Sequence, residues 1–177
     1  MAVEMDVERV RDMEPRKRAE YDAQVEERVI RFRELRPEWM AYREAALPAH
    51  ERALYGYVGS VAAENPAFRS SVLDGENFCF TIVRADPGKG APLHAHTTEE
   101  VFMPLTGRWA IYWGEDGSRR VFLERWDAVS IPAPVMRGFW NASEDTAHLL
   151  AIQGSGSPPP PIYHPSVLEE VATPPRR

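Results

Sequence analysis

Short apolar runs separated by polar turns fill the chain between residues 78 and 152, and their length limits the fold more than any other feature. Side chains alternate along residues 78–83 and 109–113 as in strands with one buried face. Residues 114–117, with glycine at both ends, close a hairpin. Further strands are predicted over residues 121–123, 128–131, 135–140 and 147–152. Short strands at this spacing indicate an all-β antiparallel sandwich or barrel.

The segment before residue 70 has a helical pattern instead. Tyr21, Val25, Val29 and Phe32 recur at spacings of three and four, which predicts one apolar stripe along a helix. Pro15 sets a boundary ahead of this helix. An apolar stripe needs a partner surface, so we expect it to pack on the barrel or on a second copy of the chain.

Two prolines predict two more short helices in this segment. Pro37 suits the first turn of one helix, and Pro48 can open the next. Their apolar residues are Trp39, Met40 and Leu47 in the first and Leu54 and Tyr55 in the second.

The C-terminal segment combines a flexible piece with a stiff one. Residues 154–157 alternate glycine and serine, and residues 158–161 are four prolines that favour polyproline II. The apolar residues that could anchor this tail on the barrel are Ile162, Tyr163, Val167 and Leu168. The predicted organisation is an N-terminal helical extension, a barrel and a proline-rich tail, over residues 1–70, 71–157 and 158–177.

Two histidines and a glutamate lie at a spacing that suits a metal ion. In an extended strand, side chains two residues apart share a face, so His94, His96 and Glu100 project to one side and Glu99 to the other. Two imidazoles and one carboxylate form the ligand set that leaves open positions on a divalent metal, most typically non-haem Fe(II). Satisfied core or surface histidines are the alternative reading of the same pattern.

The spacing from Gly88 through these three residues to Gly107 resembles the first motif of the cupin superfamily, in its single-domain type-2 (RmlC-like) form. A second cupin motif follows less completely: Trp126 stands where it opens with glycine, followed by Asp127, Pro132, Pro134, Arg137 and Asn141. The resemblance covers the chain from Phe78 to Gln153. It implies a small antiparallel β-barrel (a double-stranded β-helix, or jelly roll) with a metal or ligand site inside.

Arg137 stands where the family usually has a histidine as fourth metal ligand. A guanidinium has no lone pair to donate, so the predicted site has three ligands. Three interpretations stay open. Arg137 could bind the anionic group of a substrate with its two-pronged fork; it could pair with Glu100 in a site without metal; or His148 could supply the missing imidazole.

Three residues of this second motif share one strand face. Arg137, Phe139 and Asn141 are two apart, which predicts an apolar pocket with one cation, suited to a small organic acid. The other aromatic residues of this part of the chain are expected in the core: Trp109, Trp113 and Trp140.

Composition narrows the class of protein. The formal charge of −6 over 177 residues argues against a nucleic-acid binder, and no apolar run is long enough to span a membrane. Residues 1–14 are charged throughout and lack the apolar core of a secretory signal, so we expect a cytoplasmic location. Cys79, the single cysteine, stands in an apolar run and is expected to be a buried hydrophobe.

The sequence therefore predicts a metal-dependent enzyme, most naturally a non-haem oxygenase, acting on a small anionic molecule as a homodimer. His94, His96 and Glu100 would hold Fe(II), or alternatively Mn, Ni, Zn or Cu, and Arg137 would orient the substrate as a catalytic residue. Isomerase, lyase and decarboxylase chemistry are alternatives, because one cupin scaffold hosts many reactions. The alternative is a ligand-binding or sensing cupin without metal.

Overall fold

A computed structural model describes residues 14–61 and 63–172, which belong to two compact units, one within residues 1–33 and one within residues 34–177. The first unit contains helix α2 (Pro15–Glu27), whose first residue is the predicted boundary proline. The helix ends before Val29 and Phe32, so the predicted stripe is shorter than expected and only Tyr21 and Val25 lie on it. No described helix is both long and apolar enough to cross a membrane.

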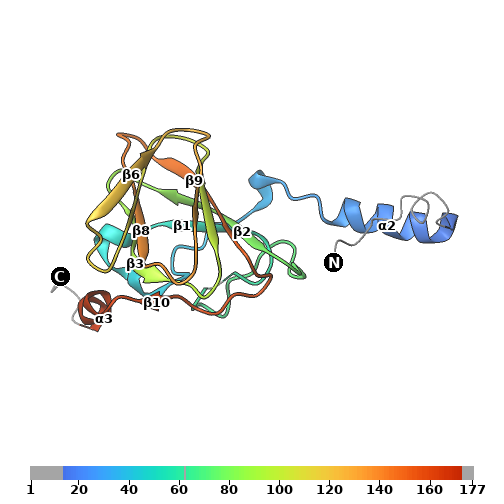
Figure 1. The fold of residues 1–177 in the computed structure, drawn as a ribbon. Coiled ribbons are helices and arrows are strands. Elements are labelled where there is room, and N and C mark those ends of the chain that lie inside the picture. The colour runs from blue at the N-terminus through green and yellow to red at the C-terminus, as the bar shows by residue number, and fades with distance from the viewer. Residues whose placement is uncertain (1–13, 62, 173–177) are drawn as a thin grey trace. The chain divides into compact units, whose positions relative to one another are not determined.

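The second unit is built from two antiparallel five-stranded sheets (Figure 1). The first sheet has the order β1-β2-β9-β4-β7, and the second has the order β10-β3-β8-β5-β6. The first sheet comprises β1 (Ala53–Val58), β2 (Cys79–Ala85), β9 (Ala147–Gln153), β4 (Glu100–Pro104) and β7 (Val129–Ile131). The second comprises β10 (Ile162–Tyr163), β3 (Gly90–Ala95), β8 (Arg137–Asn141), β5 (Trp109–Trp113) and β6 (Arg119–Leu123).

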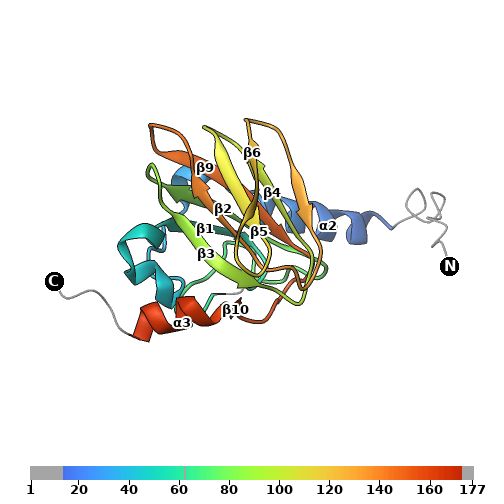
Figure 2. The same ribbon diagram turned by 60° about the vertical axis from the view of Figure 1, so that its left-hand side comes forward.

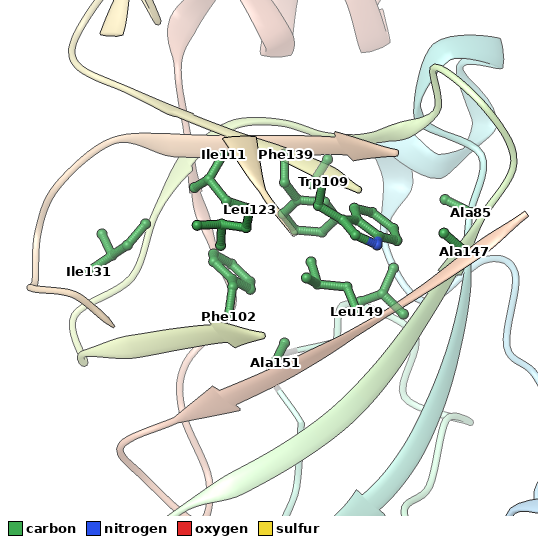
Figure 3. Close-up of a cluster of buried hydrophobic side chains, with 12 residues drawn as sticks. Ala85, Phe102, Trp109, Ile111, Leu123, Ile131, Phe139, Ala147, Leu149 and Ala151 are labelled. Carbon is green, nitrogen blue, oxygen red and sulfur yellow. The ribbon is translucent and has the colours of Figure 1, made fainter. Parts of the chain in front are cut away.

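The inner faces of the two sheets form one apolar core, and its members lie where the alternation placed them. Trp109, Phe102 and Leu149 are completely buried and converge between the sheets (Figure 3). Phe139 contacts Phe102 and Trp109 edge to face, with ring centroids 5.2 and 5.9 Å apart. The strands predicted over residues 78–83 and between residues 109 and 152 are confirmed to within about two residues at their ends, and the fold is a small all-β jelly roll of the predicted kind.

The two helices predicted after Pro37 and Pro48 are wrong. Residues 43–50 form only two short 3-10 turns, η2 (Arg43–Ala46) and η3 (Pro48–His50). Leu54 and Tyr55 then enter strand β1, which pairs along β2. This pairing supplies the ladder hydrogen bonds that β2 lacks on its outer side, so tertiary contact overrides a helical start signal. The barrel's first strand therefore lies within the segment assigned to the helical extension.

The C-terminal segment forms one edge of the second sheet. Strand β10 pairs with β3, and helix α3 (Pro165–Ala172) follows it beneath the barrel (Figure 2). Tyr163 and Val167 are buried, as predicted for anchors, whereas Ile162 and Leu168 are exposed. The remaining parts of the predicted terminal segments, residues 1–13 and 173–177, lie outside the described residues.

Trp126 occupies a backbone conformation that favours glycine. Its φ is 77° and its side chain is 60% exposed, with the Arg125 guanidinium 4.8 Å from the ring centroid. We expect Trp126→Gly to be more stable than Trp126→Ala by about 1 kcal/mol, because both lack the ring and only glycine is unstrained there. Urea denaturation of the two variants measures this difference. Equal stability would show that the backbone at residue 126 is not strained.

Candidate metal centre

His94, His96 and Glu100 converge inside the barrel. One potential ligand atom from each lies within 4.8 Å of the others, and all three side chains are buried. The convergence was predicted, but not its cause. His94 lies on β3 and Glu100 opens β4, in different sheets, so a turn over residues 97–99, and not one continuous strand, brings them together. Glu99 points away, as predicted, and accepts a hydrogen bond from the Ser130 hydroxyl.

The surroundings of the two histidine rings leave ring nitrogens for a metal. The Nδ1 atom of His94 lies 2.8 Å from the carbonyl oxygen of Pro92 and must donate to it, which leaves Nε2 unprotonated in the neutral ring. Fixing a ring in this way is typical of metal-ligating histidines. Nδ1 of His96 is buried and has no hydrogen-bond partner among the described residues. The donor set therefore fits a divalent metal ion.

Burial keeps both imidazoles in the neutral form that ligation requires. It lowers the pKa of His96 to about 3 and that of His94 well below its ordinary value, and the nearby charge of Arg137 lowers both further. Burial raises the pKa of Glu100, and this rise is opposed by the charge and hydrogen bonds of Arg137.

Arg137 lies beside this cluster and is paired with Glu100. Its Nε and Nη2 atoms donate to the same Glu100 oxygen, Oε2, over 3.0 and 2.5 Å. Nη1 reaches the carbonyl oxygen of Val135 at 3.4 Å. The residue is opposite His94 in the β3–β8 ladder and is fully buried. Of the three arrangements of Arg137 left open by the sequence, the structure has the ion pair with Glu100. The pair involves only Glu100 Oε2, and Oε1 accepts no hydrogen bond from Arg137.

A cavity of about 40 Å³ opens beside the cluster. A water molecule needs roughly 10–15 Å³ on this measure, so the cavity holds about three or four heavy atoms. On one side it is lined by His94, His96, Glu100 and Phe139. Four further polar lining residues come from outside the two motifs, and they are Tyr42, Glu44, Arg52 and Tyr163.

These four residues were not predicted as site residues. Arg52 and Glu44 form a buried pair with Nη2 and Oε1 2.6 Å apart, and the Tyr163 hydroxyl donates to Glu44 Oε2 over 2.7 Å. Tyr42 places its ring 5.1 Å from the Arg52 guanidinium, and burial raises its pKa. Arg52 and Glu44 are eight residues apart in the sequence, and nothing in their local pattern distinguished them from surface charges.

Other predicted residues lie outside the cavity. The Asn141 amide donates to the carbonyl oxygens of Ala85 and Asp145 and accepts from the backbone nitrogen of Ser143, so it fixes turns and does not line the cavity. His148 lies on β9 with Nδ1 3.4 Å from the Thr106 hydroxyl, away from the metal cluster. Cys79 is buried, as predicted, and burial raises the pKa of its thiol to about 12.

Comparison with known proteins links the barrel to one family. Residues 81–153 match the family model described as a cupin domain. No curated protein sequence matches the chain.

Solved structures share the fold at low sequence identity. The polyketide cyclase RemF from Streptomyces resistomycificus is 18% identical with a TM-score of 0.57, over 76% of this chain and 83% of that one. A cupin 2 domain-containing protein from Halorhodospira halophila is 17% identical with a TM-score of 0.51, over 68% and 76% of the two chains. The DMSP lyase DddQ from Ruegeria pomeroyi DSS-3 is 17% identical with a TM-score of 0.51, over 63% and 51%. At these identities the similarity is one of fold.

Proposed function

The chain carries a type-2 cupin domain in residues 81–153, and from this premise we propose that it is a metal-dependent enzyme acting on a small organic molecule, most naturally as a mononuclear non-haem oxygenase. The observation that carries this proposal is the buried cluster of His94, His96 and Glu100 on the wall of a cavity. Two neutral imidazoles and one carboxylate suit Fe(II) best, and Mn, Ni, Zn or Cu could replace it.

When bound, such a metal supplies open coordination positions for activating dioxygen or for polarising a carbonyl or hydroxyl group. The chain's own residues then have distinct tasks. His94 is held by its hydrogen bond to Pro92, and Arg137 holds the Glu100 carboxyl group by two hydrogen bonds to Oε2. Phe102 and Phe139 exclude water from the apolar side of the cavity. The small volume selects a substrate, or a reacting end of one, of a few heavy atoms.

The reaction class is a separate question from the fold. The structural neighbours include a protein described as a polyketide cyclase and one described as a DMSP lyase, and one fold supports many chemistries. Isomerase, lyase or decarboxylase reactions at this site are therefore alternatives to oxygenation within the same proposal.

A second candidate function is favoured by one observation. Because Arg137 neutralises Glu100 directly, the cluster is electrostatically satisfied without a metal. A ligand-binding or sensing cupin that holds no metal would have this arrangement.

Elemental analysis separates the two candidates. Protein purified without chelator, and again after incubation with Fe(II), Mn, Ni, Zn or Cu, is expected to retain close to one divalent ion per chain. Retention of none of these metals would reject the enzyme and favour the ligand-binding function.

We also propose that the chain is a homodimer in a cytoplasmic setting. The support is apolar surface on α2, where Tyr21 is 46% and Val25 is 66% exposed although both are large hydrophobic residues. Multi-angle light scattering at micromolar concentration is expected to give twice the mass of the chain, and Val25→Glu to shift it toward one chain. A monomer mass for the unaltered protein would contradict this prediction.

A further inference from the structure

Three charged side chains line the cavity, those of Glu44, Arg52 and Glu100, and each belongs to a closed ion pair, Glu100 with Arg137 and Glu44 with Arg52. This balance of charge determines which ligands can enter. We infer that the metal-free cavity accepts small uncharged polar ligands and rejects anions. It accepts an anion only when a bound metal supplies positive charge. The carboxylate of Glu44 keeps the net charge of the metal-free cavity at zero. The metal-dependent half of the inference rests on the proposed function. The metal-free half does not.

The first pair is Arg137 with Glu100. Both donors on one edge of the guanidinium, Nε and Nη2, bond Glu100 Oε2, and Nη1 is directed to the carbonyl oxygen of Val135. Glu100 thus fills one edge of the guanidinium, and Arg137 itself is 1% exposed and does not line the cavity. A substrate anion could reach it only by displacing Glu100.

The second pair is Arg52 with Glu44, both of which line the cavity. Both side chains are almost completely inaccessible to solvent, at 4% and 2% exposure. Arg52 Nη2 bonds Glu44 Oε1, and Nη1 bonds the carbonyl oxygen of His50 at 2.9 Å. The other Glu44 oxygen accepts the Tyr163 hydroxyl. This arginine is therefore also neutralised by a dedicated carboxylate.

The consequence follows from the cost of burying charge. Each pair sums to zero, so an added anion would bring one uncompensated negative charge into a site shielded from water. An unpaired buried charge is strongly unfavourable, whereas an uncharged polar group needs only a hydrogen bond. The hydroxyl groups of two cavity-lining residues, Tyr42 and Thr81, make no hydrogen bond to another described residue. They could therefore form hydrogen bonds with an uncharged polar ligand. The predicted anionic substrate thus requires the metal.

The test compares two probes of nearly equal shape, acetamide and acetate, each with four heavy atoms. They are titrated calorimetrically into protein freed of metal by a chelator and checked by elemental analysis. We expect acetamide to bind at least tenfold more tightly than acetate. In protein loaded with Zn or Co(II) we expect acetate binding to rise at least tenfold, and in the Co(II) form to change the visible absorption spectrum.

The second experiment uses the variant Glu44→Gln, which is expected to gain affinity for acetate. Its amide keeps the size of the carboxyl group but leaves the charge of Arg52 unopposed, so metal-free Glu44→Gln should bind acetate at least tenfold more tightly than the unaltered protein. The matched control is Glu64→Gln. Glu64 also contacts the Tyr163 hydroxyl, at 3.2 Å, but is paired with Arg43 and does not line the cavity, so acetate binding should not change.

Three outcomes would overturn the inference: acetate binding the metal-free protein as tightly as acetamide, no detectable acetamide binding, or a folded Glu44→Gln variant without gain of acetate binding. If Glu44→Gln does not fold, the comparison of acetamide with acetate in the unaltered protein still decides. A protein that retains no metal but discriminates between the two probes would reject the proposed function and leave the charge balance supported.

Discussion

His94→Ala combined with His96→Ala should lower the metal content of the protein from about one ion per chain to none. The double change removes two of the three donors that lie within 4.8 Å of one another and leaves a single carboxylate already bonded to Arg137. Divalent transition metals in proteins are held by three or four ligands, so one remaining donor should give no measurable affinity. Elemental analysis after gel filtration measures the loss.

A matched change at another histidine separates ligand loss from damage to the barrel. His148 lies on the same barrel but outside the cluster, so His148→Ala should keep its metal. Circular dichroism should show the same sheet content for both variants, since the imidazoles contribute little to the apolar core. Metal retained by the double variant at one ion per chain would place the metal site elsewhere.

Arg137→Ala should lower the free energy of unfolding of the metal-free protein by about 3–5 kcal/mol, the scale for removing one partner of a buried ion pair. Its physical cause is the Glu100 carboxylate, which is buried and accepts both hydrogen bonds from Arg137. A bound divalent metal would supply positive charge to the same carboxylate. Metal should therefore stabilise Arg137→Ala more than it stabilises the unaltered protein. Urea denaturation with and without metal measures both effects.

Arg108→Ala is the matched control for this prediction. Arg108 also forms a pair, with Glu124 at 2.9 Å, but both side chains are about half exposed or more. An exposed pair of this kind contributes about 0–1 kcal/mol, and metal should not alter the cost. A loss at Arg137 as small as that at Arg108 would mean that the Arg137–Glu100 pair contributes little to stability.

Arg137→His tests the geometry of the fourth position directly. Residue 137 is the partner of His94 in the β3–β8 ladder and contacts Glu100, so an imidazole there is expected to tighten metal binding compared with Arg137→Ala. Competition with a chromophoric chelator ranks the two variants. Equal affinities would mean that side chains shorter than arginine at this position do not reach the metal.

Much of the barrel could be predicted from the sequence because its determinants are local. The alternation of side chains along residues 78–83 and 109–113 indicates strands with one buried face. Gly114 and Gly117 permit the left-handed turn that joins β5 to β6. The three candidate metal ligands were likewise recognisable, since two of them are separated by a single residue and the third follows at short range.

What only the tertiary structure decided involves contacts between distant parts of the chain. Leu54 and Tyr55 follow a helix-like signal, yet they form a strand because β2 offers an unpaired edge. Arg137 could have faced a substrate or Glu100, and the ladder that places it opposite His94 directs it to Glu100. The polar wall of the cavity unites Glu44, Arg52 and Tyr163, the last of them 119 residues from its hydrogen-bond partner. Local periodicity and turn chemistry act within a few residues, whereas charge pairing and strand edges act between segments, so the sequence alone determined the barrel and its candidate metal ligands but not the charge of the cavity.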